Sequence, residues 1–195
     1  MFQGNKPVLI LPTLLMIFMF VGGYIYLKQS EAVTNEELQR VIELDANTVL
    51  TGERSLRVDI EWDWTTMPKE GLRGDDYIGV ALMDKDSDEV RTDVKVSHAT
   101  LELTFGDDVL KKIEGNVVDN GVIFVFPNRV SDNRSYGNVG RATVVFEGER
   151  LDETLPRVHY LHTWTEGPSL KLEDALFSDP SFEGEGEVPY WLLSR

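Results

Sequence analysis

Three aspartates alternate in the segment MDKDSDEV, residues 83–90, and their spacing is the clearest chemical pattern in the chain. Asp84, Asp86 and Asp88 stand where the first three oxygen ligands of a calcium-binding loop would stand. The pattern then departs from an EF-hand, because Glu89 occupies the place of the glycine and Lys95 that of the bidentate glutamate. The aspartates therefore predict, at most, a calcium site in a loop between strands. A solvated turn is the simpler interpretation.

Cysteine and histidine limit the other chemistry that the chain could perform. There is no cysteine, which excludes a cysteine nucleophile, a cysteine-based zinc site and disulfides. His159 and His162 are three positions apart, so on a strand they face opposite sides and cannot share a metal ion. A hydrolase of envelope polymers that uses two carboxylates stays open, because the 34 acidic residues supply many possible pairs. That hypothesis predicts an acidic cleft holding a carboxylate of raised pKa.

Three groups of residues are candidate contacts with a protein partner. The polar segment 128–141 is locally basic in an otherwise acidic chain, and Trp64 ends an apolar series beside a loop. An apolar tip follows the Gly- and Glu-rich residues 178–187, and apolar area costs about 25 cal/mol per Å² to leave in water. The tip must therefore dock, either on its own domain as an added strand or on a partner. The predicted partner-binding residues are Trp64, Arg129, Arg134, Arg141, Tyr190, Trp191, Leu192 and Leu193.

The elements that must position these residues are strands. From Ser55 to Trp64 (SLRVDIEWDW) apolar and charged residues alternate, which predicts a half-buried strand with Trp62 and Trp64 on its apolar face. Residues 76–83 are apolar on both faces, as in a central strand, and a change of parity around Ser97–His98 predicts a bulge or a break. About seven strands without intervening helices predict an all-β fold, an antiparallel β-sandwich of immunoglobulin-like size.

The segment Val8–Leu27 (VLILPTLLMIFMFVGGYIYL) has no charged residue and the length of a transmembrane helix, which needs about 20 residues. A cleaved signal peptide, with Ser30 and Ala32 before the cleavage site, is the alternative, but its apolar region usually has about 7–15 residues. Lys6 before the helix favours an N-terminus inside the cell. We therefore expect an uncleaved single-pass anchor in the cell membrane, with the bulk of the chain outside the cytoplasm.

A short stalk is expected between the anchor and the sandwich. Thr34 and Glu37 form a capping-box pattern ahead of an amphipathic stretch, which predicts a short helix over Asn35–Leu44. The expected organisation is a tail and anchor over residues 1–28, a stalk over 29–50, the sandwich over 51–167 and a C-terminal extension over 168–195.

Charge and composition favour one class of function. All 34 acidic residues lie after residue 28, so nucleic acid, which is bound by clustered Lys and Arg, is not expected as a partner. An external domain without disulfides is more typical of a bacterial envelope than of a eukaryotic secreted protein. We therefore expect a non-catalytic interaction module without a cofactor, an accessory or assembly subunit that binds a protein in the membrane or envelope. A calcium-dependent adhesion module and the carboxylate hydrolase are the alternatives.

Overall fold

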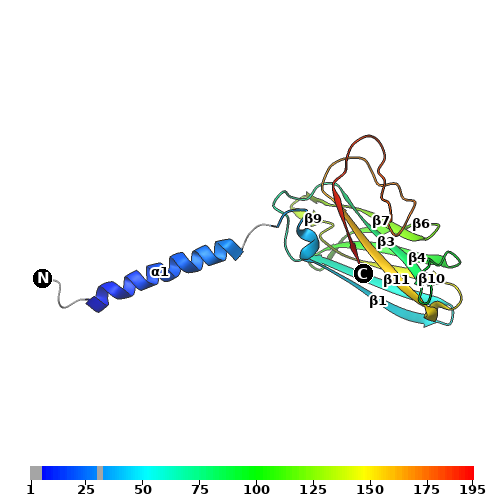
Figure 1. Cartoon of the computed structure of the whole chain (residues 1–195), viewed down its shortest axis with the longest axis horizontal. Coiled ribbons are helices and arrows are strands. Elements are labelled where there is room, and N and C mark those ends of the chain that lie inside the picture. Colours follow the sequence, from blue (N-terminus) through cyan, green and yellow to red (C-terminus); the bar gives the residue numbers. More distant parts are fainter. Residues whose placement is uncertain (1–5, 30–32) are drawn as a thin grey trace. The chain divides into compact units, whose positions relative to one another are not determined.

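The computed structural model describes residues 6–29 and 33–195, which fall into two units that meet between Val33 and Thr34. The first unit contains helix α1 (Lys6–Gln29), with Pro12 inside it (Figure 1). No helix among the described residues combines the length and the hydropathy that crossing a membrane requires. The predicted tail before Lys6 and the alternative cleavage site at Ser30 and Ala32 lie outside the described residues.

The second unit is a sandwich of two five-stranded antiparallel sheets, which confirms the predicted all-β fold (Figure 1). Sheet A has the order β1-β2-β10-β4-β5, formed by β1 (Ile42–Gly52), β2 (Ser55–Trp64), β10 (Val139–Glu147), β4 (Lys95–Phe105) and β5 (Asp108–Glu114). Sheet B has the order β12-β11-β3-β7-β6, formed by β12 (Tyr190–Ser194), β11 (Thr154–Thr163), β3 (Asp75–Asp84), β7 (Gly121–Pro127) and β6 (Asn116–Val118). A separate hairpin consists of β8 (Arg129–Ser131) and β9 (Arg134–Tyr136).

Strand β2 keeps the alternation that its sequence predicts. The residues Leu56, Val58, Ile60, Trp62 and Trp64 are all buried on the face toward sheet B. Trp62 packs on Phe126, with ring centroids 5.1 Å apart, and its indole N–H donates to the Gly137 carbonyl at 2.8 Å. Trp64 is only 4% exposed. Its prediction as a partner contact is therefore corrected: the indole belongs to the core.

The predicted stalk helix ends after one turn. Thr34 and Glu37 do form the capping box, because the Glu37 N–H donates to Thr34 Oγ1 at 3.2 Å and the Thr34 N–H to Glu37 Oε2 at 3.3 Å. Only a 3₁₀ turn, Leu38–Arg40, follows. Strand β1 then begins at Ile42, which lies opposite Trp64 in the adjacent strand. Burial of apolar side chains against β2 outweighs the helical pattern, so the sandwich includes most of the predicted stalk.

The change of parity in strand β4 is a bulge, not a break. Val145 pairs with His98 and Phe146 with Val96, so Ser97 has no opposite residue in β10. The strand continues through this point from Lys95 to Phe105. The extra residue moves the apolar side chains after it onto the buried face, as the sequence indicates.

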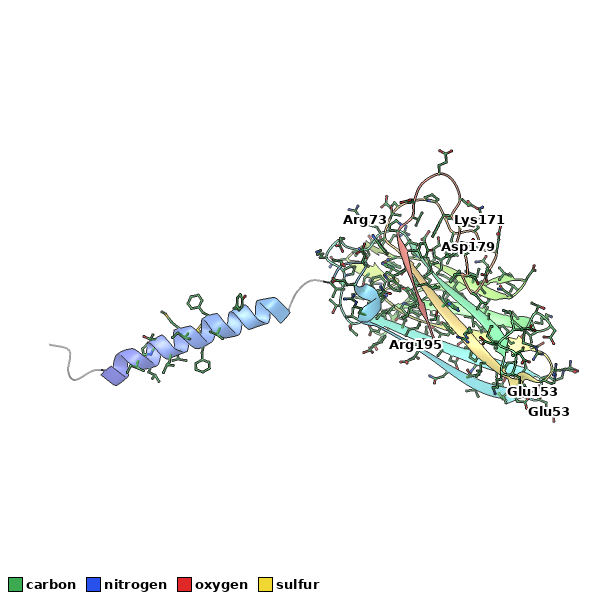
Figure 2. All side chains as sticks on the ribbon, viewed as in Figure 1. Glu53, Arg73, Glu153, Lys171, Asp179 and Arg195 are labelled. Atoms are coloured by element: carbon green, nitrogen blue, oxygen red, sulfur yellow. The ribbon has the colours of Figure 1, made fainter. Side chains whose placement is uncertain are left out.

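The C-terminal extension covers the outer face of sheet B. Tyr77, Ala81, Ile123 and Leu161 on that face form one apolar cluster with Leu170, Ala175 and Phe177 of the extension. This cover explains why β3 is apolar on both faces. The approach is close, because a Cβ at Gly79 would lie 2.0 Å from the Ala175 carbonyl oxygen. Figure 2 labels Lys171 and Asp179 in this extension, together with Arg195 beyond β12.

Candidate functional site

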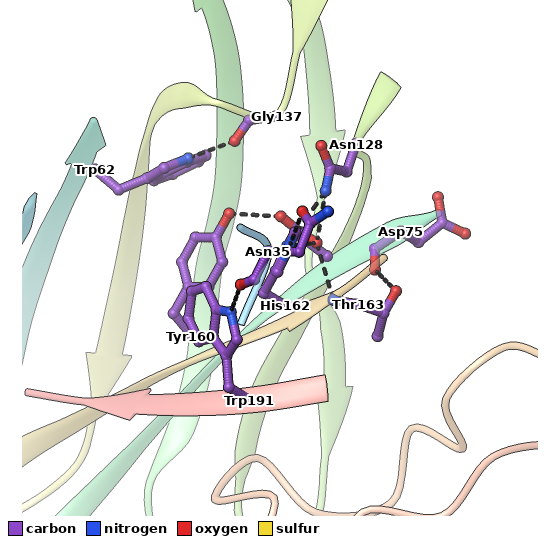
Figure 3. Close-up of polar contacts among 10 residues, drawn as sticks. Asn35, Trp62, Asp75, Asn128, Gly137, Tyr160, His162, Thr163 and Trp191 are labelled. Carbon is purple, nitrogen blue, oxygen red and sulfur yellow. Dashed lines mark hydrogen bonds and ion pairs between the residues drawn. The ribbon is translucent and has the colours of Figure 1, made fainter. Parts of the chain in front are cut away.

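The only acid–base pair that is fully enclosed among the described residues joins Asp76 and His162 in the core between the sheets. Asp76 Oδ1 lies 2.8 Å from His162 Nδ1, and both side chains have no exposed surface (Figure 3). Asp76 stands on β3 and His162 on β11, and both point to the inner side of sheet B. Removing charges from water costs several kcal/mol per ion, so the pair requires further hydrogen bonds.

The Asp76 carboxylate receives those hydrogen bonds from three further donors. The Tyr160 hydroxyl donates to Oδ2 at 2.7 Å, while the Asn128 side-chain amide and the Thr163 backbone N–H each donate to Oδ1 at 3.3 Å. Burial raises the pKa of the Tyr160 phenol well above its ordinary value, and the adjacent Asp76 charge adds to the shift. The phenol therefore stays protonated and keeps its role as a donor to Asp76.

The second nitrogen of His162 faces another acceptor. His162 Nε2 lies 3.1 Å from Asn35 Oδ1, and Asn35 Nδ2 donates to Glu70 Oε2, which fixes the orientation of this amide. On the other side of the ring, His162 Nδ1 lies 2.8 Å from Asp76 Oδ1 and 3.3 Å from the side-chain amide nitrogen of Asn128. Both ring nitrogens of His162 therefore have hydrogen-bond partners.

Tryptophan rings surround the imidazole of His162. The centroids of Trp64, Trp164 and Trp191 lie 5.1, 5.6 and 4.9 Å from that of His162. Aromatic rings at such distances attract each other by about 0.5–1.5 kcal/mol beyond the effect of their buried area. The cluster is thus a fully enclosed Asp–His pair in an aromatic cage. Neither side chain of the pair has surface that a substrate could touch.

The apolar tip docks on its own domain. Strand β12 pairs with β11, and Trp191 is 7% exposed and stacks on Tyr160 at 5.7 Å. Its indole N–H donates to the Asn35 carbonyl at 2.7 Å. Leu192 and Leu193 are half-buried in the same strand, and Tyr190 is exposed. The tip is therefore an added strand of sheet B, which corrects the prediction that Trp191 meets a partner.

The structure separates the three arginines that were predicted to act together. Arg129 and Arg134 lie on the β8–β9 hairpin and are exposed. Arg141 lies on β10, where its guanidinium contacts Glu102 Oε2 at 2.6 Å, and Lys112 contacts Glu102 Oε1 at 2.6 Å. The hairpin arginines stay candidate partner contacts, whereas Arg141 is neutralised within sheet A.

The aspartates of residues 84–88 stabilise a turn. Asp84 Oδ1 accepts the backbone N–H groups of Ser87 and Asp86 at 3.0 Å each, and these bonds lower the pKa of the Asp84 carboxyl. Asp88 contacts Arg157 at 2.9 Å. No group of three His, Cys, Asp or Glu side chains within the described ranges could hold a metal ion. The geometry thus favours the solvated turn over the calcium site.

The two features that a carboxylate hydrolase requires occur at different places. Burial raises the pKa of Asp75, and the adjacent Asp76 charge adds to the shift. Asp75 lines a hollow of about 300 Å³ beside Arg73 and Arg129. The acidic hollow, of about 410 Å³, lies elsewhere and is lined by Glu43, Asp45, Glu61, Asp63 and Asp107. The carboxyl group of raised pKa, Asp75, is therefore not among the residues that line the acidic hollow.

Sequence reasoning missed the Asp76–His162 pair, although a signal was present. Asp76 shares its parity with Ile78, Val80 and Leu82 of β3, and His162 shares its parity with Val158 and Tyr160 of β11. A charged residue at an inward position of a buried strand needs a partner. Two polar residues at inward positions of adjacent strands are therefore candidate partners of one another.

His159 makes the stability of the domain depend on pH, and this stability decreases as the pH falls. Burial lowers the pKa of the imidazole below its ordinary value, and the Arg157 charge adds to the shift. In the unfolded chain this imidazole titrates near pH 6.5. As the pH falls from about 6.5 to the lower pKa of the folded state, the unfolded chain therefore binds more protons than the folded chain. The free energy of unfolding is accordingly higher at neutral pH and decreases over this range. We expect His159→Gln to flatten this part of the curve of melting temperature against pH, measured beside the parent protein. Equal slopes for the parent and His159→Gln would contradict this assignment.

Comparisons with known proteins give no family for this chain. No family model matches it, and no curated protein matches it. One similar solved structure is AvmM, described as catalysing macrocyclization in alchivemycin A biosynthesis, which is 11% identical over 79% of this chain and 88% of its own, with a TM-score of 0.35. Another is the GAE domain of yeast GGA1, 12% identical over 79% of this chain and 90% of its own, with a TM-score of 0.23. At these TM-scores neither likeness bears on the function of the chain.

Proposed function

We propose that the chain is a membrane-anchored interaction module whose immunoglobulin-like sandwich binds a protein partner and catalyses no reaction. In this proposal the uncharged segment Val8–Leu27 is a single-pass anchor, and the sandwich lies outside the cytoplasm. The module would serve as an accessory or assembly subunit of an envelope complex.

The single observation that carries the proposal is the complete burial of the Asp76–His162 pair. This pair is the constellation that most resembles catalytic machinery, and catalysis requires groups that touch a substrate. Its enclosure by Tyr160, Asn35 and three tryptophans favours a structural role. What the domain does would then depend on its outer surface.

The outer surface offers the β8–β9 hairpin as one contact region. Val130, the middle residue of β8, is 62% exposed, and Arg129 and Arg134 lie on the two strands of the hairpin. An exposed apolar side chain between arginines is a common composition of protein interfaces, in which arginine is enriched.

Site-specific photo-cross-linking in native membranes tests this proposal. A photoreactive residue at Val130 is expected to capture a protein neighbour in the membrane fraction, and added protease is expected to reach the sandwich from outside the cytoplasm. A photoreactive residue at Leu155, which is 50% exposed, is the matched control. Recovery of the chain in the soluble fraction, or protection of the sandwich from external protease, would contradict the proposal.

A further inference from the structure

The sandwich has four edge strands, and β1 differs from the other three. β12 and β6 have five and three residues, and β5 carries Lys111 and Lys112. Short strands and lysines are devices that prevent an edge from pairing with another chain. β1 has eleven residues and contains neither lysine nor proline. It is therefore the edge that is most open to an added strand.

The backbone direction of β1 follows from its neighbours. The Trp64 N–H donates to the Asn138 carbonyl beside β10. The even-numbered residues of β2 therefore direct their backbone N–H and C=O groups toward β10 and away from β1. The β1 residues opposite them, which are also even-numbered, consequently direct their backbone groups away from β2, to the unpaired edge of the sheet. Arg195 Nε confirms this direction, because it donates to the Leu44 carbonyl at 3.1 Å from outside sheet A. Beyond Leu44, the free N–H and C=O groups are those of Ala46, Thr48 and Leu50.

The side chains along this half of β1 leave apolar surface uncovered. Val49 is 44% exposed and Leu50 is 50% exposed, on opposite faces of the strand. Leu50 has the parity of Ile42 and Leu44, which are buried. The inner face of sheet A is thus covered near the start of β1 and open toward its end. An added strand with apolar side chains on this inner face would cover it.

The outer face of the same edge carries unbalanced negative charge. Glu43 lies opposite Asp63, and Asp45 opposite Glu61, so carboxylates face carboxylates across both pairs. Like charges in this position destabilise a sheet. Within residues 33–195 none of the four is within ion-pair distance of a cationic side chain. Arg141 lies opposite Glu61 and lines the acidic hollow, but it pairs with Glu102, which also contacts Lys112. All four carboxylates line the hollow of about 410 Å³.

We propose that β1 accepts an extended segment of a protein partner as a sixth strand of sheet A, and that this segment alternates basic and apolar residues. Its backbone would bond to Ala46, Thr48 and Leu50, its lysine or arginine side chains would meet Asp45 and Glu43, and its apolar side chains would cover Leu50. This inference rests on the proposed function and names the partner's chemistry. A second copy of the chain is disfavoured as the occupant by the net charge of −15, since two such domains repel each other.

A binding titration on the full-length protein in detergent tests the proposal. The probe is a labelled synthetic peptide that alternates lysine and valine, and its control alternates glutamate and valine. We expect saturable binding of the lysine peptide and at least about tenfold weaker binding of the glutamate peptide. Equal binding of the two peptides would overturn the proposed charge complementarity.

Substitutions at Thr48 separate backbone pairing from surface attraction. Thr48→Pro removes an N–H that points to the free side, a position where an edge strand tolerates proline. Thr48→Val keeps this N–H and is the matched control. We expect Thr48→Pro to weaken binding of the lysine peptide by about tenfold or more and Thr48→Val to leave it unchanged. Unchanged affinity of a folded Thr48→Pro would refute an added strand. If that variant fails to fold, Asp45→Asn replaces it as the test, and unchanged affinity there would refute the role of Asp45.

Two further results distinguish this inference from the proposed function. Capture at Val130 without binding of the lysine peptide would refute the role of β1 alone. Peptide binding by a chain that proves to be soluble in the cell would refute the membrane role alone. Concentration-dependent dimers of the parent that Thr48→Pro abolishes would show that the occupant is a second copy, which overturns the basic partner.

Discussion

Replacing Asp76 with alanine is expected to lower the free energy of unfolding by about 3–5 kcal/mol, enough to unfold a domain of ordinary stability at 37 °C. The variant would leave His162 without its carboxylate partner in a site with no exposed surface, and it would remove the acceptor of the Tyr160 hydroxyl. Urea denaturation of the parent and the variant measures the difference.

The control for this variant is Asp88→Asn, which removes the charge and keeps a residue that tolerates the positive φ of this position, 55°. Asp88 also pairs with a basic side chain, at 2.9 Å from Arg157, but both partners are exposed. Exposed pairs contribute about 0–1 kcal/mol, so this variant should be close to the parent. If both variants lost the same free energy of unfolding, burial of the Asp76–His162 pair would not explain how much the pair contributes to stability.

The second large effect is expected from Trp191→Ala, which should cost about 3–5 kcal/mol. The indole packs against both Tyr160 and His162, and its N–H donates to the Asn35 carbonyl. The substitution would therefore open the aromatic cage and detach β12 from β11. Urea denaturation measures the loss, and hydrogen exchange of the β12 amides should rise with it.

Tyr190→Ala is the control in the adjacent position. Tyr190 is 42% exposed and contacts Phe182 at a centroid distance of 5.9 Å, so its removal should cost far less than that of Trp191. If both variants lost the same stability, the strand pairing of β12 and not the cage would hold the C-terminal extension.

The strands could be predicted from the sequence wherever one face is buried. The alternation in β2 and the bulge at Ser97 both followed from parity, because burial of one face leaves a period of two. The sequence predicts a helix for the stalk because it contains a capping box, and the structure does form the hydrogen bonds of that box. The chain leaves the helix after Arg40, since Ile42 and Leu44 contact β2 residues far along the sequence. A local pattern contains no information about such contacts.

The site was harder to predict than the fold for the same reason. The sequence presents His162 only as one of two histidines that cannot share a metal ion, and it assigns no role to Asp76. The hydrogen bond between Asp76 and His162 joins residues 86 positions apart. Its existence depends on β3 and β11 being neighbours in sheet B, and strand order does not follow from the pattern of each strand alone.

The hydrogen bond between Trp191 and Asn35 joins residues 156 positions apart, so it can form only when almost the whole chain has been synthesised. At about 5–20 residues per second, a ribosome needs about 10–30 s to synthesise the chain between these two residues. All-β domains typically fold within milliseconds to seconds once all their strands are present. Of the tryptophans around His162, Trp64 is synthesised long before Trp164 and Trp191, so it stays uncovered for a time that translation determines. A chaperone that shields aromatic surface would act in that interval.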